Sequence, residues 1–154
     1  VSIHQGNSAY VIVEGPTWEE AEANANVLGG HLVTINNADE NEFLRTNVAP
    51  YSRSSTDGLW IGLTDKEQEG VVNWADGQTS IYRNWVSRGP DDFLGQDYGM
   101  FYSNGTWDDS ESPFRQGLES INGIAEIPFI RYNDSAYVVV SGPTWDEAQV
   151  NAAT

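Results

Sequence analysis

The chain contains no cysteine, few basic residues and no long hydrophobic run. Without cysteine, no disulfide, thiolate zinc site or cysteine nucleophile can form. No stretch of 18 apolar residues is present, so the sequence predicts no membrane-spanning helix. It begins with Val1 and shows no signal peptide, and we therefore expect it to be part of a longer protein.

Basic residues are scarce: 7 Lys and Arg stand against 23 Asp and Glu, which gives a net charge of −16. Nucleic acids and anionic membrane surfaces require clustered Lys and Arg, so the charge argues against both partners. The acidic balance fits either cation binding or simply a hydrated surface. With 154 residues, 39% of them hydrophobic, the chain is long enough for one domain with a core and too short for two ordinary ones.

An internal repeat is the clearest feature that the sequence does contain. Residues 8–21, SAYVIVEGPTWEEA, reappear as residues 135–148, SAYVVVSGPTWDEA, at an offset of 127 residues (135 minus 8). This offset corresponds to a whole domain and not to a solenoid unit. We therefore predict one domain over residues 1–130 and the start of a second, truncated repeat over residues 131–154. The alternative is a symmetric pair of ends within one domain.

The repeated segment at the C-terminal side cannot bury its apolar face alone. We expect residues 135–154 to be frayed, or docked on their own domain or on a neighbouring one. Two capping patterns predict helices: Thr17 with Glu20 opens one through Leu28, and Asn37 with Glu40 opens a second. Short apolar runs predict strands or extended segments over residues 10–13, 31–35, 59–63, 100–102, 106–107 and 123–127.

Residues 64–107 are rich in Gly, Asp, Asn and Trp and have little helical periodicity. A long loop of this kind inside a compact domain usually carries function. Its window from Gly89 to Asp109 contains five aspartates and Gln96. Hard cations such as Ca²⁺ take six to eight oxygen ligands, which a loop and a neighbouring strand end can supply together. The pattern therefore predicts a calcium site.

Eight short motifs occur in an order that resembles the C-type lectin-like domain, over roughly residues 8–128. The resemblance implies an α+β double-loop fold in which two helices flank small antiparallel sheets and a long loop binds calcium. The lack of cysteine resembles a bacterial-type version from a tandem-repeat protein. The motifs are Trp18-x2-Ala21, Gly29-Gly30-x-Leu32, Trp60-Ile61-Gly62-Leu63, Trp74-x2-Gly77, Asn84-Trp85, Pro90-Asp91, Trp107-x-Asp109 and Glu126-x-Pro128.

The chain departs from that family where the usual disulfides would lie. Ala25 and Ala125 occupy one pair of positions, and Tyr98 and Ser112 occupy the other. Two lost cross-links remove about 2–4 kcal/mol each. We expect packing of the tryptophans and bound calcium to offset this loss.

The resemblance also implies a calcium that holds a sugar. Sugar hydroxyls would complete the calcium shell and hydrogen bond to the same ligand side chains. The Pro90-Asp91 pair resembles the galactose-type version, and Phe93 is placed to stack on the apolar face of a sugar or, alternatively, to pack inside the loop. Gly89 argues against sugar binding, because the family has Glu or Gln there. The implied calcium ligands are Asp91, Gln96, Asp108 and Asp109, and the implied sugar-binding residues are Asp91, Phe93, Gln96 and Asp108.

A second, auxiliary calcium site is implied beside the first. Carboxylates gathered there without a cation would repel one another and raise their pKa values. We expect calcium to order the loop with an affinity of roughly 10⁻⁴–10⁻³ M. Near Glu126 and the second helix, at Glu40 and Asn41, a further cation is one alternative, and a structural salt bridge or hydrogen bond is the other. The implied auxiliary ligands are Asp65, Glu69, Asp92, Gln96 and Asp97.

Two functions remain from the sequence. The first is a calcium-dependent carbohydrate-binding module of an extracellular or cell-surface tandem-repeat protein, with glycans and neighbouring repeats as partners. The second is an adhesin repeat or protein-binding domain in which calcium is only structural. An enzyme is disfavoured: Asp108 and Asp109 suggest a glycosidase pair, but adjacent strand residues point to opposite faces, and no Ser-His-Asp set is present.

Overall fold

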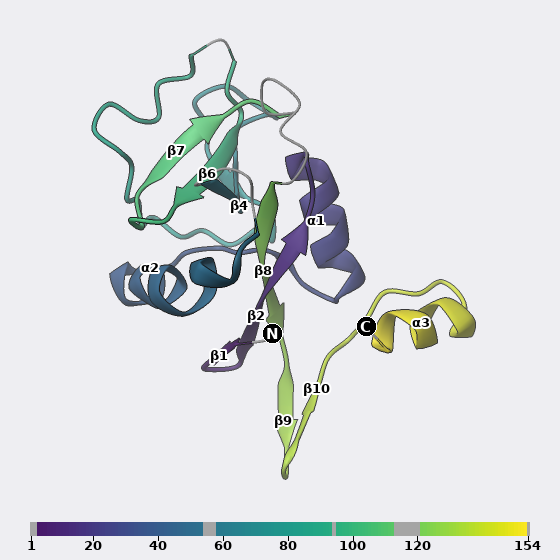
Figure 1. Cartoon of the computed structure of the whole chain (residues 1–154). Helices are drawn as coiled ribbons and strands as arrows, with labels where there is room; N and C mark the ends of the chain where they lie inside the picture. Colours follow the sequence, from purple (N-terminus) through teal and green to yellow (C-terminus); the bar gives the residue numbers. More distant parts are fainter. Residues whose placement is uncertain (1–2, 54–57, 94, 113–120, 154) are drawn as a thin grey trace.

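The computed structural model describes residues 3–53, 58–93, 95–112 and 121–153. One sheet organises the fold, with the strand order β1-β2-β8-β4-β6-β7, while β3 pairs with β8 and β5 with β4. Helices α1 and α2 lie on either side of the β2–β8 pair (Figure 1). The elements are β1 (Ile3–Gln5), β2 (Ser8–Glu14), α1 (Trp18–Val27), β3 (His31–Leu32), α2 (Ala38–Phe43), the π-helical turn η1 (Leu44–Val48), the 3₁₀ turn η2 (Ala49–Tyr51), β4 (Gly58–Thr64), β5 (Asn73–Trp74), β6 (Tyr98–Tyr102), β7 (Trp107–Ser110), β8 (Asn122–Pro128), β9 (Ile130–Tyr132), β10 (Ser135–Tyr137) and α3 (Trp145–Ala152).

The expected α+β architecture is confirmed, but the sheet is mixed and not purely antiparallel. Strand β2 runs antiparallel to β8, with Ser8 opposite Pro128 and Glu14 opposite Asn122. Strand β4 runs parallel to β8 and antiparallel to β6. Six of the seven residues of β4 are buried, because both faces of this central strand are covered; that is why its sequence is a continuous apolar run.

Helix α1 begins where the sequence predicts. The Thr17 hydroxyl accepts from the Glu20 backbone N–H, and the Glu20 side chain accepts from the Thr17 N–H, which completes a capping box. Trp18, Ala21 and Ala25 face the core. The Trp18 indole N–H donates to the Ile61 carbonyl at 2.7 Å, so the helix is tied to β4 by a buried hydrogen bond as well as by packing.

Helix α2 also begins at its predicted cap, where the Asn37 side chain accepts from the Glu40 N–H. Glu40 is buried, and its carboxylate accepts from the Tyr10 hydroxyl and the Asn36 N–H, each at 2.8 Å. A buried carboxylate needs such partners, because burial of an unpaired charge is costly. The contact therefore fixes α2 against β2.

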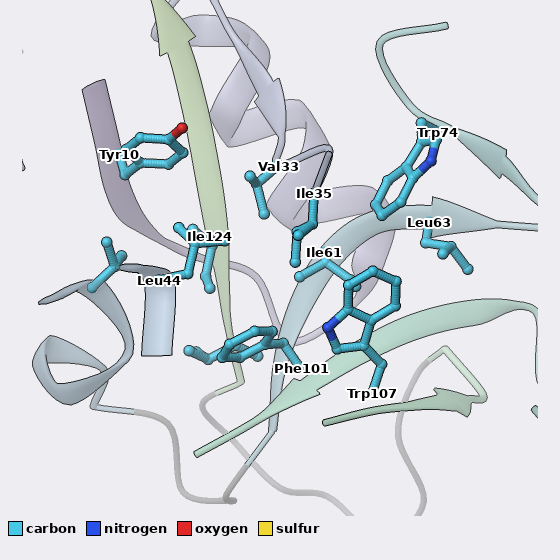
Figure 2. Packing of buried hydrophobic residues seen from close by; sticks show 12 residues of the cluster. Tyr10, Val33, Ile35, Leu44, Ile61, Leu63, Trp74, Phe101, Trp107 and Ile124 are labelled. Atoms are coloured by element: carbon cyan, nitrogen blue, oxygen red, sulfur yellow. The ribbon is translucent and has the colours of Figure 1, made fainter. Parts of the chain in front are cut away.

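The main core joins Leu44 and Val48 of η1 to side chains from β2, β4, β6, β7 and β8 (Figure 2). Trp107 and Phe101 are fully buried at its centre. Each large apolar side chain buried there contributes about 1.5–3 kcal/mol of transfer free energy. The cluster comprises Tyr10, Val33, Ile35, Leu44, Val48, Leu59, Ile61, Leu63, Trp74, Phe101, Trp107 and Ile124.

The positions of the absent disulfides are occupied in two different ways. Ala25 and Ala125 are both fully buried in the second apolar cluster. Tyr98 and Ser112 instead both donate hydroxyl hydrogen bonds to the Glu19 carboxylate, which also pairs with Lys66 at 2.7 Å. Glu19 at the start of α1 thus joins segments that a disulfide would otherwise connect.

The repeated segment forms secondary structure but little core. Strands β9 and β10 make a two-stranded sheet of their own, and α3 follows at the end of the molecule (Figure 1). Strand β10 is three residues long, whereas its counterpart β2 is seven. The difference follows from pairing, because β2 lies on β8 over its whole length.

Candidate functional site

The indole of Trp107 positions the acidic part of the molecule. Trp107 is fully buried at the start of β7, and the rings of Trp74, Tyr82 and Trp85 pack edge-on against it at 5.5–5.8 Å between centroids. Its indole N–H donates to the Asn41 side-chain oxygen at 2.8 Å. These contacts fix the strand that carries Asp108 and Asp109 immediately after Trp107.

The backbone of the long excursion is tied to β7 at the same level. The Trp107 N–H donates to the Asn84 carbonyl and the Val86 N–H donates to the Trp107 carbonyl. The Asn41 and Asn84 amides both donate to the Gly105 carbonyl, at 2.9 and 2.7 Å. The base of the loop is therefore held by buried hydrogen bonds before any ligand is considered.

Asp109 organises the tip of the loop. Its buried carboxylate accepts from the backbone N–H groups of Asp91 and Asp92, at 2.6–3.1 Å. The Gly89–Pro90 peptide that precedes them is cis, and Asp92 has a left-handed backbone with φ 46°. Asp91 in turn accepts from the Phe93 N–H. One carboxylate thus fixes the position of two others.

A pocket of about 200 Å³ lies between the loop and the end of β4. Every residue predicted for the auxiliary calcium lines it, and Asp109, predicted for the sugar-site calcium, lines it as well. We call this the acidic pocket. Its carboxylate- and amide-bearing residues are Asp65, Glu69, Asp92, Gln96, Asp97 and Asp109.

The carboxylates of the acidic pocket affect one another. Partial burial raises the pKa of Glu69, and the negative charges of Asp65, Asp92 and Asp97 raise it further. A backbone hydrogen bond joins the two sides, since the Asp65 N–H donates to the Asp97 carbonyl at 3.1 Å. Within its own segment, the Asp65 carboxylate accepts from the Gly70 N–H at 3.1 Å. The pocket is therefore a place where a positive charge would be stabilised.

The donor set fits a hard cation by its chemistry. Carboxylate and amide oxygens are the ligands that Ca²⁺ takes, and no soft sulfur or imidazole is among them. Within the described part of the chain, no three Asp, Glu or His side chains are already close enough together to hold a metal ion. The backbone thus brings the ligands to one pocket, and calcium would have to draw the exposed side chains together.

Asp91 and Asp108 do not line the acidic pocket. Asp108 accepts from the Tyr102 hydroxyl at 3.3 Å. Burial raises the pKa of Asp108, and the negative charge of Asp109 raises it further. A Cβ atom at Gly89 would lie 2.9 Å from both the Asp108 carboxylate oxygen and the Val86 Cγ2 atom, so a larger residue there would require these two side chains to shift.

Phe93 is an exposed aromatic at the tip of the loop, with 62% of its surface accessible. The two alternatives from the sequence were a sugar-stacking ring and a ring packed inside the loop. An exposed ring beside Asp91 is available to a ligand. Sequence patterns had not assigned a supporting role to Asn84, although the Asn84-Trp85 motif marked the segment, and they had considered Asn41 only beside Glu40 and Glu126.

The cluster around Glu126 is held by hydrogen bonds. Glu126 accepts from the Ser8 hydroxyl at 2.6 Å. Burial raises the pKa of Glu126, as do the charges of Glu40 and Asp76, while the Ser8 hydrogen bond lowers it. His31 likewise has a structural contact, with its Nδ1 atom 2.6 Å from the Glu22 carboxylate. The structure supports the hydrogen-bond alternative at this place.

Comparison with known proteins identifies the family. The model of the Lectin C-type domain matches residues 14–115, which is more than half of the chain. The chain therefore belongs to the C-type lectin domain family. This is a family of lectins and not of enzymes, in agreement with the prediction from sequence.

Among curated proteins, the chain is 33% identical over 100 residues to an alpha-N-acetylgalactosamine-specific lectin of Patiria pectinifera, which covers 62% of this chain and 60% of that protein. It is 34% identical over 109 residues to the versican core protein of Homo sapiens, covering 68% of this chain and 3% of that protein. The chain thus spans less than two thirds of the length of these relatives. They are eukaryotic, so the bacterial-type expectation finds no support.

Solved structures agree with this assignment. The carbohydrate-recognition domain of a mouse scavenger receptor C-type lectin matches with a TM-score of 0.69 and 29% identity, over 85% of this chain and 96% of that one. The cow CD23 domain, solved in the presence of GlcNAc2Man3 oligosaccharide, matches with a TM-score of 0.69 and 29% identity, over 84% of this chain and 95% of that one. A calcium-independent type II antifreeze protein matches with a TM-score of 0.68 and 25% identity, over 82% and 91%. None of the described helices has the length and apolar character that crossing a membrane requires.

Proposed function

We propose that this chain is a calcium-dependent carbohydrate-binding domain, with a galactose-type preference. The observation that carries the proposal is the acidic pocket, in which oxygen donors from the segment after β4, from the long loop and from β7 meet. Asp65, Glu69, Asp92, Gln96 and Asp97 would hold one calcium ion. Bound calcium would neutralise their mutual repulsion and fix the loop for ligand binding.

The sugar-binding part of the proposal concerns the outer side of the loop. Asp91, Gln96, Asp108 and Asp109 are the residues that would hold the second calcium, whose remaining coordination positions sugar hydroxyls would fill. The exposed ring of Phe93 is available for the apolar face of the sugar. Two relatives favour this function, because a curated relative is named for N-acetylgalactosamine specificity and a solved neighbour was crystallised with an oligosaccharide.

A second candidate function has specific support. Gly89 carries no side-chain oxygen, so it cannot supply the calcium ligand that the Glu or Gln of the family provides at this position. A calcium-independent protein is among the structural neighbours, so this fold does not require the metal. In this alternative the domain is an adhesin repeat or protein-binding module, and calcium in the acidic pocket is structural only.

Calcium binding is tested by thermal unfolding in calcium and in chelator. A ligand that binds only the folded state at 100 times its Kd stabilises it by about 2.7 kcal/mol, which raises the midpoint of a domain of this size by roughly 5–10 °C. Asp92→Asn should reduce the shift, whereas Asp146→Asn, in the exposed helix α3, should leave it unchanged. Equal midpoints in calcium and chelator for the unchanged protein would contradict calcium binding.

Sugar binding is tested separately on immobilised galactose and mannose. The lectin proposal expects retention in calcium, elution by free galactose and loss in chelator. Phe93→Ala should weaken retention about fivefold, because stacking contributes about 1 kcal/mol. A calcium-induced thermal shift without retention on either sugar supports the second candidate function instead.

We also propose that the parent protein is an extracellular or cell-surface array of such domains. The support is the repeat of residues 8–21 at residues 135–148. Arrays suit either function, since several weak sites on one chain reach a high combined affinity.

A further inference from the structure

The Glu19 carboxylate, in the first turn of α1, is a meeting point for three distant parts of the chain. It accepts hydrogen bonds from Tyr98 at 2.5 Å, from Lys66 at 2.7 Å and from Ser112 at 2.9 Å. We call these four residues the Glu19 cluster. Hydrogen bonds to an ionised group are about twice as strong as neutral ones, and one carboxylate receives three of them here. Helix α1 is therefore joined at this point to three segments outside it.

Each donor of the Glu19 cluster lies next to a wall of the acidic pocket. The walls are the segment after β4, the end of the long loop and the end of β7. Glu19 itself does not line the pocket, so it acts on the walls through its donors. The neighbours in sequence are Lys66 directly after Asp65, Tyr98 directly after Asp97, and Ser112 three residues after Asp109.

Tyr98 is the most direct of these links. Its side chain lines the acidic pocket and is only 3% exposed. Its ring packs against Trp18 with 5.2 Å between the centroids, while its hydroxyl donates to Glu19. The Tyr98 backbone pairs with both neighbouring strands, opposite Thr64 of β4 and Ser110 of β7. The hydroxyl contact therefore fixes a ring that forms part of the pocket wall.

The other two donors of the cluster lie nearer the surface. The Lys66 ammonium is 5.5 Å from the centre of the Tyr98 ring as well as beside Glu19. The Ser112 hydroxyl accepts from the Trp18 N–H at 3.0 Å while it donates to Glu19. Both contacts with Glu19 are exposed, and an exposed ion pair alone stabilises a protein little. We therefore expect the buried Tyr98 to contribute most.

The Glu19 cluster stands where the resemblance to the lectin family places a cross-link. Tyr98 and Ser112 occupy the two positions of that disulfide, and here their hydroxyls share one carboxylate. Lys66 joins them as a third partner, which a disulfide would not include. A site whose ligands are already held in place binds an ion more tightly, because less ordering accompanies binding.

We propose that Glu19 is a positioning residue of the calcium site, because its cluster holds the walls of the acidic pocket in place for the ion. The inference rests on the proposed function for the identity of that ion. The ordering of the walls by Glu19 is also a property of the metal-free protein, so it is measured separately.

The first test compares calcium affinities of the full chain. Titrations with calcium chloride are followed by tryptophan fluorescence, because Trp85 lines the acidic pocket. Tyr98→Phe keeps the buried ring and every charge and removes only the hydroxyl that reaches Glu19. Calcium should bind about tenfold more weakly, the smallest loss typical when groups that orient metal ligands are replaced. Unchanged calcium affinity in Tyr98→Phe overturns the proposal.

A double variant shows whether Tyr98 acts through Glu19. Glu19→Ala removes the shared acceptor and should weaken calcium binding at least as much as Tyr98→Phe. The two changes together should then bind calcium as Glu19→Ala does alone, because partners in one network are not additive. Losses that multiply in the double variant contradict the proposal.

Asn37→Ala is the control for a mere loss of stability. It removes the side-chain cap of α2, and the residue does not line the acidic pocket. Its calcium affinity should equal that of the unchanged protein. An equal loss of affinity in Asn37→Ala would assign the effect to stability and overturn the proposal.

The second test is amide hydrogen exchange in chelator, which needs no bound metal. The Asp65 N–H donates to the Asp97 carbonyl across the pocket, and it should exchange several-fold faster in Glu19→Ala and Tyr98→Phe, with α2 unchanged. Asn37→Ala should show the reverse pattern. Unchanged exchange at Asp65 overturns the inference, whatever happens to calcium binding. If the unchanged protein binds no calcium, the proposed function is wrong, and exchange at Asp65 still decides whether Glu19 orders the pocket.

Discussion

Trp18 and Trp145 occupy the same place in two copies of one sequence, at exposures of 8% and 76%. Each follows a threonine cap and begins a helix. Only Trp18 reaches a buried partner, the Ile61 carbonyl. The comparison teaches that capping and turn residues specify a local structure wherever they occur, whereas stability comes from the surface that this structure covers.

The largest difference is expected for these two tryptophans. Trp18→Ala should lower the free energy of unfolding by about 3–5 kcal/mol, because it opens a cavity and leaves a buried carbonyl without its donor. Trp145→Ala should change it by less than about 0.5 kcal/mol, as is usual for exposed side chains. Urea unfolding followed by circular dichroism measures both. Equal losses would show that Trp145 is buried in solution.

Substitution of the two helix caps, Thr17 and Thr144, is expected to have smaller effects on stability. The two variants should differ mainly in which part of the molecule is destabilised. Thr17→Ala should lower the free energy of unfolding of the whole domain by about 1 kcal/mol. Thr144→Ala should instead speed amide hydrogen exchange in α3 alone and leave the urea midpoint unchanged, because α3 opens independently of the core. A shifted urea midpoint in Thr144→Ala would show that α3 unfolds together with the core.

Glu19 and its counterpart Asp146 should differ in how their contributions to stability depend on pH. Burial raises the pKa of Glu19, but hydrogen bonds from Lys66, Tyr98 and Ser112 outweigh it and lower the pKa to about 2. A carboxyl group with a lowered pKa stabilises the folded state above its ordinary pKa of 4.5, and this contribution is lost as the pH falls towards 2.

Glu19→Gln should therefore cost about 1 kcal/mol at pH 7, a value that takes account of screening at this half-exposed side chain. The difference from the unchanged protein should shrink below pH 4 and vanish near pH 2. Asp146→Asn should have no effect at either pH within about 0.5 kcal/mol. A pH-independent effect of Glu19→Gln would assign the loss to packing instead of charge.

Much of the fold could be predicted from local sequence. The capping residues Thr17 and Asn37 placed the helix starts, and apolar runs placed β2, β4 and β8. These signals work because they act over a few residues. The parallel contact between β4 and β8 was not predicted, because no local pattern states which distant strands become neighbours.

The candidate site, like the fold, was predicted only in part from the sequence. The residues of the acidic pocket were named from sequence and lie together in the structure. The sequence did not predict that Asp109 lies in that pocket. It also did not predict the hydrogen bonds that Asp109 accepts from the Asp91 and Asp92 N–H groups. Both features arise from the packing of Trp107, which fixes the position of β7 relative to the loop.

The sequence by itself determined that the chain forms the hairpin–helix unit twice, because turn, strand and cap residues recur at an offset of 127 residues. Only the tertiary structure decided that one unit is core and the other is exposed. The physical reason is that burial depends on which surfaces lie within reach: β8 and α2 lie against Tyr10, whereas β10, which carries Tyr137, pairs only with the short strand β9.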